Sequence, residues 1–407
     1  MSNKRHVIVG AGHAARRAAE TLRARNADVQ IVMIGAEAHA PYDRPVLSKG
    51  ALMSEEGERK AFIRPHDWYA AHRIDLRLSA TVTEVDRRRA CVRLDDGSEI
   101  GYDRLLLATG SRVRRFSGPV DQRVPLHYVR TLADARALRA VLAPGKRVAI
   151  LGGGFIGLEV AAAATQAGCK ATVIEPAPAL LQRALPHSVA DHIAALHERN
   201  GVDLRLGTMP HAIIYENGGA SIEIDAGAVG VVADVVVVGI GVVPNVELAE
   251  ACELEVRNGI VVDEQCRTND PAIFAAGEVT MHANPLLGRS VRIESWQVAE
   301  NQPVVAAENM LGGGAIYAEL PWLWSDQFDC NVQTLGIIEA QHRLVTWGDP
   351  AIGSFCVMAL DESGRVRAAI SVNSGRDMGA CRRLIASGTV IDEVRLADAS
   401  VSLRSLL

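Results

Sequence analysis

The sequence predicts an α/β protein with two Rossmann-like domains, each built on a parallel sheet, and a separate α+β domain at the C-terminal end. Two stretches carry this prediction: RHVIVGAGHAARRAAETLRARNADVQIVMIG at 5–35 and KRVAILGGGFIGLEVAAAATQAGCKATVIE at 146–175. Both have the order strand, glycine-rich turn, helix and strand, which is typical of a β-α-β unit. The chain of 407 residues is long enough for two such units and a further domain.

The first glycine-rich turn follows the apolar strand at 7–9. Gly10 permits a tight turn, Gly12 lets the backbone approach a pyrophosphate, and the small Ala15 lets helix pack on strand. The free N–H groups of the helix would face the phosphates. The acid expected to bind a ribose hydroxyl is Glu37, which lies slightly late because Gly35 and Ala36 intervene.

The second turn repeats this pattern with Gly152, Gly154 and Gly157, and it includes Phe155 and Ile156. Glu175 closes the next strand, where its carboxylate can accept both ribose hydroxyls of an adenosine. A 2′-phosphate would meet like charge there, so NADH is favoured over NADPH. A single such turn could be a plain tight turn, but two in one chain predict two dinucleotides, FAD at the first and NAD at the second.

Composition excludes several other classes of protein. A net charge of −5 gives no global attraction to nucleic acid. The N-terminal apolar stretch is too short for a secretory signal and ends at Arg16. The longest apolar run, VVADVVVVGIGVV at 231–243, is too short to span a membrane and contains Asp234. We expect that run to form a strand buried on both faces of a parallel sheet.

The seven cysteines are scattered and never form C-x-x-C. This spacing argues against a metal or iron–sulfur site and against a disulfide framework, and it predicts a cytoplasmic protein.

Four further stretches carry a family resemblance: PYDRPVLSKGAL at 41–52, YDRLLLATGS at 102–111, TNDPAIFAAGEV at 268–279 and LPWLWSDQFDCNVQTLG at 320–336. With the two turns, they resemble the FAD-dependent NADH:ferredoxin or rubredoxin reductases that serve bacterial oxygenases and cytochromes P450. These enzymes belong to the glutathione-reductase-like flavoproteins that bind two dinucleotides. The resemblance runs over essentially the whole chain.

The resemblance implies that Arg44, Pro45 and Lys49 lie along the flavin. The Lys49 ammonium would stabilise negative charge near the flavin N5 edge, and Arg44 would pair with phosphate. The alternative is a surface turn with solvated charges. Glu159 would lie near the nicotinamide carboxamide and pair with Lys49 before NADH arrives, or would only complement the helix dipole.

Trp324 would border the space between flavin and nicotinamide, with Trp322 serving in packing, although any tryptophan can be a core residue. Further cofactor contacts implied by the resemblance lie mainly at strand ends and at one helix start. They are Val82, Ala108, Thr109, Gly110, Arg130, Gly241, Gly277, Glu278, Trp296 and Val298. At Glu278 the family usually has Asp, and at Val298 a polar amide, so we expect FAD to be held less tightly than in relatives.

The chemistry implied is hydride transfer from NADH to FAD and release of single electrons. No cysteine lies between Met1 and Cys91, so an internal thiol relay is not expected. Electrons would pass to an external iron–sulfur protein, with a [2Fe–2S] ferredoxin favoured and rubredoxin next. The alternatives are an NADH oxidase or quinone reductase that uses no protein acceptor, and a flavoprotein whose NADH-dependent state signals to a partner.

The predicted domains are an FAD-binding domain at 1–112 and 246–318, an NAD-binding domain at 113–245 and an α+β domain at 319–407. An acidic ferredoxin would dock on a locally basic face. The candidates for that face are Arg112, Arg114, Arg115, Arg382 and Arg383, although each could be an ordinary solvated arginine.

Overall fold

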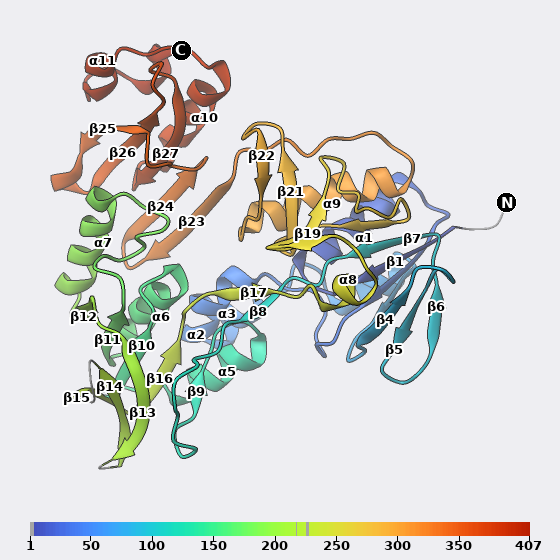
Figure 1. Ribbon diagram of the computed structural model, residues 1–407. Helices are drawn as coiled ribbons and strands as arrows, with labels where there is room; N and C mark the ends of the chain where they lie inside the picture. Colours follow the sequence, from blue (N-terminus) through green and yellow to red (C-terminus); the bar gives the residue numbers. More distant parts are fainter. Residues whose placement is uncertain (1–3, 217, 225–227) are drawn as a thin grey trace. The chain divides into compact units, whose positions relative to one another are not determined.

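The computed structural model describes residues 4–216, 218–224 and 228–407, and the chain forms two compact units (Figure 1). Unit 1 comprises the chain up to Val46, Glu58–Arg112 and Val242–Leu320. Unit 2 comprises Leu47–Gly57, Val113–Gly241 and Pro321–Leu407. Unit 2 therefore includes both the segment predicted to bind NAD and the C-terminal segment, and the division into three domains stays a prediction.

Unit 1 is built on a five-stranded parallel sheet in the order β20-β7-β1-β2-β3. Its strands are β1 (Arg5–Val9), β2 (Gln30–Ile34), β3 (Ile74–Arg77), β7 (Arg104–Leu107) and β20 (Ile273–Ala275). The apolar side chains of β1, β2 and β7 are buried on both faces of the sheet. Burial on both faces explains why these strands read as continuous apolar runs.

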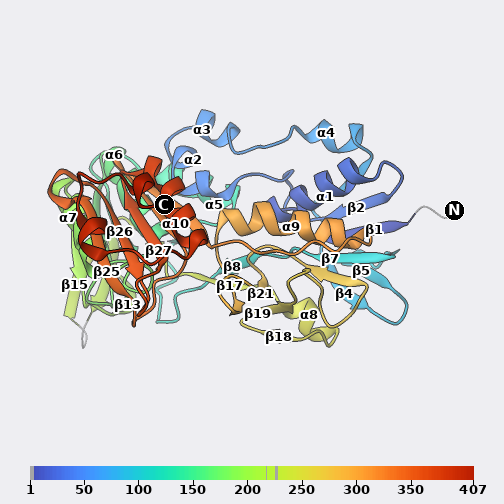
Figure 2. The same ribbon diagram turned by 90° about the horizontal axis from the view of Figure 1, so that it is seen from above.

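Helices α1 (His13–Arg25) and α9 (Trp296–Met310) pack against each other and against one face of this sheet (Figure 1 and Figure 2). Helix α1 follows Gly12 directly, and α9 begins after Ser295, whose hydroxyl accepts the Val298 N–H at 3.3 Å. The sequence predicted both helix starts. They place two helix N-termini in the unit that carries the first glycine-rich turn.

The opposite face of the sheet packs on smaller elements of unit 1. These are the sheet of β4 (Val82–Asp86), β5 (Cys91–Leu94) and β6 (Glu99–Gly101), helix α8 (Glu247–Ala251), and the sheet of β18 (Val256–Arg257), β19 (Gly259–Val262), β21 (Thr280–Asn284) and β22 (Arg289–Val291). Helix α4 (His66–Ala71) packs near β3. The connecting elements are η1 (Arg44–Ser48), α2 (Gly50–Met53), α3 (Glu55–Arg59), β8 (Ser111–Val113) and β17 (Val242–Pro244).

Unit 2 carries a second parallel sheet, in the order β12-β11-β10-β16-β9. Its strands are β9 (Leu126–His127), β10 (Arg147–Leu151), β11 (Lys170–Glu175), β12 (Asp203–Leu206) and β16 (Val235–Val238). The helices around it are α5 (Leu132–Val141), α6 (Phe155–Gln166) and α7 (His187–Arg199). The other face packs on an antiparallel sheet of β13 (Pro210–Glu216), β14 (Gly219–Ile224) and β15 (Ala228–Ala233).

The C-terminal part of unit 2 is a five-stranded antiparallel sheet in the order β23-β24-β27-β26-β25. The strands are β23 (Trp322–Gln327), β24 (Cys330–Leu335), β25 (Arg343–Asp349), β26 (Ser354–Leu360) and β27 (Val366–Val372). The helical elements are η2 (Pro350–Ile352), η3 (Gly375–Asp377), α10 (Met378–Ser387), α11 (Glu393–Ala397) and η4 (Leu403–Leu406). An antiparallel sheet with short helices after it matches the α+β architecture predicted for this segment.

One sequence expectation is wrong. The apolar run at 231–243 is not a single strand, because it is divided among β15, β16 and β17. Asp234 interrupts the run and accepts the N–H and guanidinium of Arg147, and Gly241 turns the chain with a positive φ. Only β16 lies inside the parallel sheet. Among the described residues, no helix is long and apolar enough to cross a membrane.

Candidate functional site

The first glycine-rich turn lies at the carboxyl end of β1 in unit 1. Gly10 has φ +117°, and a Cβ at this position would lie 2.2 Å from the Ala108 carbonyl oxygen at the end of β7. Gly12 faces open space, since the nearest atom to a Cβ there would be Arg44 Nη2 at 3.9 Å. An open approach beside a helix N-terminus and a guanidinium suits a pyrophosphate. These residues fit the FAD that the sequence predicts.

Arg44 lies near two other predicted FAD contacts of unit 1, Glu37 and Glu278. Its Nη2 lies 2.7 Å from Glu37 Oε1, and Tyr42 donates to Glu37 Oε2 at 2.5 Å. Burial opposes the charge of Arg44, but the nearby Tyr42, Glu37 and Glu278 raise the pKa of the guanidinium above its ordinary value. Glu37 and Glu278 therefore lie within electrostatic reach of one arginine. Glu278 is distant in the sequence from Glu37 and Arg44, yet the fold brings all three into one polar site.

The other predicted FAD contacts of unit 1 lie at element ends. Thr109 Oγ1 donates to the Asn245 carbonyl at 2.7 Å, and the Gly277 N–H donates to Gln302 Oε1 at 2.8 Å. These bonds fix the backbone after β7 and after β20. Val82, Ala108 and Val298 are buried, so their side chains contribute packing rather than a polar contact.

A charged cluster beside the Gly12 turn was missed by the sequence analysis. His13, the first residue of α1, has Nδ1 2.7 Å from Asp43 Oδ1 and Nε2 2.6 Å from Glu300 Oε2. Trp296 Nε1 also donates to Asp43 Oδ1, at 3.0 Å, and Arg16 donates to Glu300 at 2.6 Å. The cluster thus ties together the glycine-rich turn, the PYDRP segment and the start of α9.

The geometry of this cluster favours a protonated histidine. Asp43 Oδ1 lies 2.7 Å from Nδ1 and Glu300 Oε2 lies 2.6 Å from Nε2, while Arg16 Nη2 lies 2.9 Å from Nε2, so two negative charges flank the ring against one positive charge. Burial opposes the charge, but Asp43 and Glu300 raise the pKa of His13 above its ordinary value, against the opposing charge of Arg16. The sequence offers no local signal for the cluster, because Glu300 lies 287 residues away.

The second glycine-rich turn, in unit 2, repeats the backbone plan of the first. Gly152 has φ +110°, and a Cβ there would lie 2.5 Å from the Gly239 carbonyl oxygen, which follows β16. A Cβ on Gly154 would meet nothing within 4 Å. Glu175 accepts the Gly153 N–H at 2.6 Å and the Ala177 N–H at 2.8 Å. The carboxylate is therefore fixed at the strand end where a ribose would bind, and the site fits NAD.

The remaining NAD candidates also lie in unit 2. The Ile156 side chain is 43% exposed on the first turn of α6, and Phe155 next to it is half-buried. Gly241 has a positive φ, and its carbonyl accepts the Arg114 N–H at 2.9 Å. The Arg130 N–H donates to Asp134 at the start of α5.

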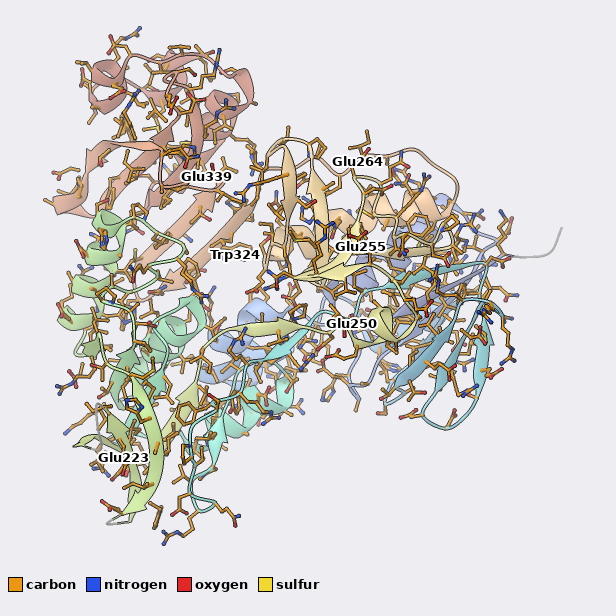
Figure 3. All side chains as sticks on the ribbon, in the orientation of Figure 1. Glu223, Glu250, Glu255, Glu264, Trp324 and Glu339 are labelled. Atoms are coloured by element: carbon orange, nitrogen blue, oxygen red, sulfur yellow. The ribbon has the colours of Figure 1, made fainter. Side chains whose placement is uncertain are left out.

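Lys49 and Glu159 form the ion pair that the resemblance implied, with Lys49 Nζ 3.3 Å from Glu159 Oε1. Lys49 Nζ also lies 3.3 Å from Asp326 Oδ2 and 5.8 Å from the centre of the Trp324 ring, which is labelled in Figure 3. Trp322 stacks on Trp324 with ring centroids 5.0 Å apart. The structure thus brings the three predicted catalytic residues, Lys49, Glu159 and Trp324, together within unit 2.

Glu159 is a buried carboxylate surrounded by donors. Ser325 Oγ donates to Oε1 at 2.6 Å, and Ser48 Oγ donates to Oε2. Burial raises the pKa of Glu159 above its ordinary value, while Lys49 and the two serines act in the opposite direction. The two serines were not predicted, because Ser325 is 166 residues from Glu159 in the sequence.

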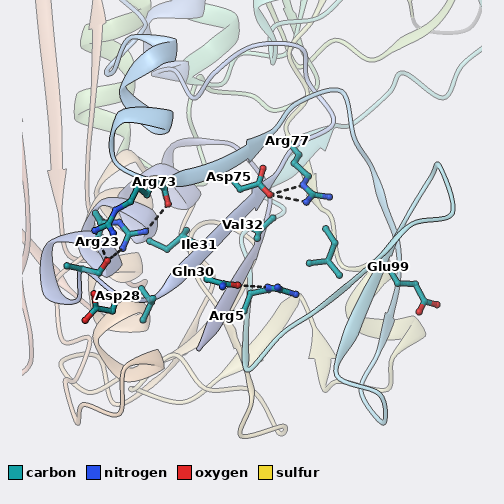
Figure 4. A pocket seen from close by; sticks show the side chains of 13 residues that line it. Arg5, Arg23, Asp28, Gln30, Ile31, Val32, Arg73, Asp75, Arg77 and Glu99 are labelled. Atoms are coloured by element: carbon teal, nitrogen blue, oxygen red, sulfur yellow. Dashed lines mark hydrogen bonds and ion pairs between the residues drawn. The ribbon is translucent and has the colours of Figure 1, made fainter. Parts of the chain in front are cut away.

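Two other features complete the description of the site. All seven cysteines are free and buried. An open groove of about 460 Å³ lies in unit 1 beside Arg5, Gln30 and Arg73 (Figure 4), away from the predicted cofactor contacts. Its arginines bond carbonyls and carboxylates of the groove wall, as when Arg23 donates to the Ala27 and His72 carbonyls. We assign the groove no ligand.

The five arginines proposed for docking all have exposed side chains. Arg112 pairs with Glu247 at 2.7 Å, and the Arg115 guanidinium lies 5.5 Å from the centre of the Tyr128 ring. These contacts do not test a docking role, which stays a prediction.

Comparison with known proteins decides the family. Residues 4–303 match the model described as pyridine nucleotide-disulphide oxidoreductase, and residues 322–407 match the reductase C-terminal model. The chain belongs to the pyridine nucleotide-disulphide oxidoreductase family. This confirms the predicted fold class and the predicted use of FAD and NAD(H) by an oxidoreductase.

Three relatives within this family cover the whole chain. The chain is 62% identical over 408 residues to the ferredoxin–NAD(+) reductase component of the anthranilate 1,2-dioxygenase system of Burkholderia cepacia, covering 100% of both chains. Among solved structures, the ferredoxin reductase for the CYP199A2 system from Rhodopseudomonas palustris has a TM-score of 0.94 at 32% identity, covering 99% of each chain. The reductase in the covalent putidaredoxin reductase–putidaredoxin complex has a TM-score of 0.95 at 34% identity, covering 100% of this chain and 98% of that one.

Proposed function

We propose that the protein is the NADH-dependent ferredoxin reductase of a bacterial oxygenase or cytochrome P450 system, passing electrons to a [2Fe–2S] ferredoxin. The observation that carries the proposal is the pairing of two dinucleotide-binding turns of one plan with the Lys49–Glu159 pair in unit 2. The relatives named above, which match over their full lengths, support the choice of acceptor.

The first turn would hold FAD. The Gly10–Ala15 turn and Arg44 would bind its phosphates, Glu37 a ribose, and the Gly277–Glu278 turn and the start of α9 would take further contacts. Bound FAD supplies a carrier that accepts two electrons from NADH and releases them singly. The chain contributes binding, charge near the ring and exclusion of water.

The second turn would hold NADH. Gly152 and Gly154 would receive its pyrophosphate at the start of α6, and Glu175 would bind the adenosine ribose and repel a 2′-phosphate. Glu159 would accept the carboxamide N–H of the nicotinamide. Lys49, which pairs with Glu159 in the structure, would then be free to place its positive charge near the reduced ring.

The seven free, buried cysteines support direct transfer to an external acceptor rather than to an internal disulfide. They also support a cytoplasmic location, where thiols stay reduced and NADH is made.

The test is NADH oxidation by the FAD-loaded protein, under anaerobic conditions and again in air, each with and without a [2Fe–2S] ferredoxin, with reduction of the acceptor followed directly. We expect strong turnover that depends on the ferredoxin. Equal NADH consumption without it, in air, would contradict the proposal and favour an oxidase or quinone reductase.

Glu159→Gln tests the proposed nicotinamide contact within this scheme. We expect an increase in KM for NADH of about tenfold, the loss of one charged hydrogen bond, with FAD content unchanged. Glu198→Gln, which alters an exposed carboxylate on α7, is the matched control. Equal KM values in the two variants would remove Glu159 from the nicotinamide site.

A further inference from the structure

A line of buried polar side chains continues from Glu159 through the interior of unit 2. Ser325 Oγ lies 2.6 Å from Glu159 Oε1, Gln327 Nε2 lies 3.0 Å from Ser325 Oγ, and His197 Nε2 lies 2.8 Å from Gln327 Oε1. Ser325, Gln327 and His197 are between 0% and 1% exposed. Full burial means that each polar atom depends on its neighbour in the line rather than on water.

The fold explains how the line forms. Ser325 and Gln327 alternate along β23 and so point to the same face of the strand. Helix α6, which packs on β23, brings Glu159 to one end of that face, and α7 brings His197 to the other. The line therefore joins the second glycine-rich turn to the C-terminal sheet.

The chemistry of the groups fixes the direction of each hydrogen bond. A carboxylate only accepts, so the Ser325 hydroxyl donates to Glu159. The Ser325 oxygen then accepts from the Gln327 amide N–H, which leaves the Gln327 carbonyl oxygen facing His197. His197 must therefore carry its proton on Nε2. Every donor in the line points toward Glu159.

The far end of the line agrees with this assignment. With the proton on Nε2, Nδ1 of a neutral His197 is a bare lone pair, and Nδ1 is buried without a hydrogen-bond partner in the described part of the chain. Burial lowers the pKa of His197 below its ordinary value, although the bond to Gln327 opposes this, so the ring stays neutral. The Phe328 ring lies 5.1 Å from the imidazole, between centroids.

We propose that Ser325, Gln327 and His197 are positioning residues that hold Glu159 as a fixed, ionised acceptor. Aligned donors polarise one another, so the line stabilises negative charge on Glu159 more than one serine would. The consequence for NADH rests on the function proposed above, in which Glu159 binds the nicotinamide carboxamide. A protonated or rotated Glu159 would lose that acceptor role.

Other charged groups also act on this line. Lys49 faces Glu159 directly and is itself shared with Asp326 on β23. At the His197 end, Arg199 on α7 lies 3.7 Å from Asp329, which follows Phe328. Neither pair includes a member of the line other than Glu159, so substitutions within the line leave both pairs in place.

The first experiment determines, without NADH, which ring nitrogen of His197 carries the proton and therefore in which direction the hydrogen bonds of the line run. In the FAD-loaded, full-length protein labelled with ¹⁵N-histidine, His197 is assigned by loss of its signals in His197→Gln. We expect a neutral ring with the proton on Nε2 between about pH 6 and pH 8, because burial excludes the charged form. A ring protonated on Nδ1, or a charged ring, would overturn the proposal.

The second experiment reads the effect on Glu159 through the pH dependence of the NAD⁺ dissociation constant. Ser325→Ala and His197→Met each remove a donor, and His197→Gln keeps an N–H near the Nε2 position. We expect the acid limb of the profile to move to higher pH, by about one unit in Ser325→Ala and by less in His197→Met. In His197→Gln the limb should lie at its wild-type position.

The outcomes separate this inference from the proposed function. Identical profiles for His197→Met and His197→Gln, with equal melting temperatures, would overturn the positioning role. If Glu159→Gln leaves NAD⁺ affinity unchanged while the His197 proton is found on Nε2, the line stands and the nicotinamide role of Glu159 fails.

Discussion

The two glycine-rich turns have the same backbone plan but differ in what covers them. In unit 1, the Ala14 side chain is 8% exposed and a Cβ on Gly277 would lie 3.0 Å from Ala14 Cβ, so the Gly277 segment packs on Ala14 while the approach to Gly12 stays open. In unit 2, the corresponding Ile156 is 43% exposed. His13, one residue before Ala14, lies in contact with the carboxylates of Asp43 and Glu300. The residue at the equivalent place in the second turn is the apolar Phe155.

This difference matches the two duties that we propose. A cofactor that stays through many turnovers is best held by segments that close over it and are tied to one another. A substrate that must leave after each hydride transfer needs an open turn. On this proposal, the same loop design serves retention in unit 1 and exchange in unit 2, and the side chains of neighbouring elements make the difference.

The largest expected effects come from replacing the first glycine of each turn, Gly10 or Gly152, by alanine. Gly10→Ala would place a Cβ 2.2 Å from a backbone oxygen at positive φ. We expect the free energy of unfolding to fall by about 3 kcal/mol or more, and we expect the protein to lose FAD. Gly152→Ala would place a Cβ 2.5 Å from the Gly239 carbonyl oxygen at positive φ, so we expect a similar loss of stability, with FAD kept and NAD⁺ binding weakened at least about tenfold. Flavin content and NAD⁺ titration measure the two effects.

Gly154→Ala is the control for this pair, because its Cβ meets no protein atom within 4 Å. It should lower NAD⁺ affinity by occupying phosphate space, with an unchanged melting temperature. Loss of FAD from Gly152→Ala at the same level as from Gly10→Ala would break the comparison.

The next largest effect is expected in the pH dependence of FAD release, through the cluster of His13, Asp43 and Glu300. The pKa of His13 is raised in the folded protein, so its stabilisation is complete below about pH 6.5, the ordinary value, and is lost as pH rises through the raised pKa. Asp43 and Glu300 have lowered pKa values, so their stabilisation is present above the ordinary range and is lost in acid.

We therefore expect FAD release from the wild-type protein to accelerate as the pH rises through the raised pKa of His13, because the folded protein then loses the proton on this ring. His13→Gln should lose FAD about tenfold faster at pH 6 and show a flatter profile, since two carboxylates lose their partner. Flavin fluorescence follows the release, and His66→Gln, at an exposed position, is the control. A profile unchanged in His13→Gln would show that the cluster does not act on FAD.

A smaller effect concerns the coenzyme. Glu175→Gln keeps the size of the side chain and removes its charge, although the single amide oxygen can accept only one of the Gly153 and Ala177 N–H groups that the carboxylate accepts. We expect the ratio of kcat/KM for NADPH to that for NADH to rise by about tenfold, because a like-charge repulsion is lost. Glu37→Gln, at the acid of the other turn, should leave this ratio unchanged and speed FAD loss instead.

The smallest effect is expected at Glu278. Asp is usual there in the families that the sequence resembles, and the extra methylene should hold FAD less tightly. We expect Glu278→Asp to slow FAD dissociation by about threefold, a fraction of one hydrogen bond. Equal dissociation rates in the variant and the parent would remove Glu278 as a cause of weak FAD binding.

Local patterns in the sequence were enough to predict the two turns, their helices and the flanking strands. Gly10 and Gly152 sit directly between an apolar strand and a helix, and neither depends on distant residues to be recognised. The run at 231–243 misled the analysis, because apolar content does not show where Asp234 and Gly241 break a strand.

The parts of the sites that the sequence could not predict are contacts between distant segments. Glu300 faces His13 only because α9 packs on α1, and Ser325 reaches Glu159 only because β23 packs on α6. The resemblance supplied Lys49, Glu159 and Trp324 as a set. Ser48, Ser325 and Gln327 lie inside stretches that carry the resemblance, but nothing in the sequence marks them or His197 as neighbours of Glu159, so only the fold identifies that role.

Whether the first turn retains its dinucleotide and the second exchanges its own can be tested by measuring how FAD and NAD⁺ leave the same preparation. The protein is saturated with FAD and NAD⁺ at pH 6.5, passed through a desalting column and dialysed, and bound flavin and nicotinamide are then counted. We expect close to one FAD per chain after dialysis and complete loss of NAD⁺. Loss of both at similar rates, or retention of NAD⁺ with loss of FAD, would contradict the assignment of one turn to retention and the other to exchange.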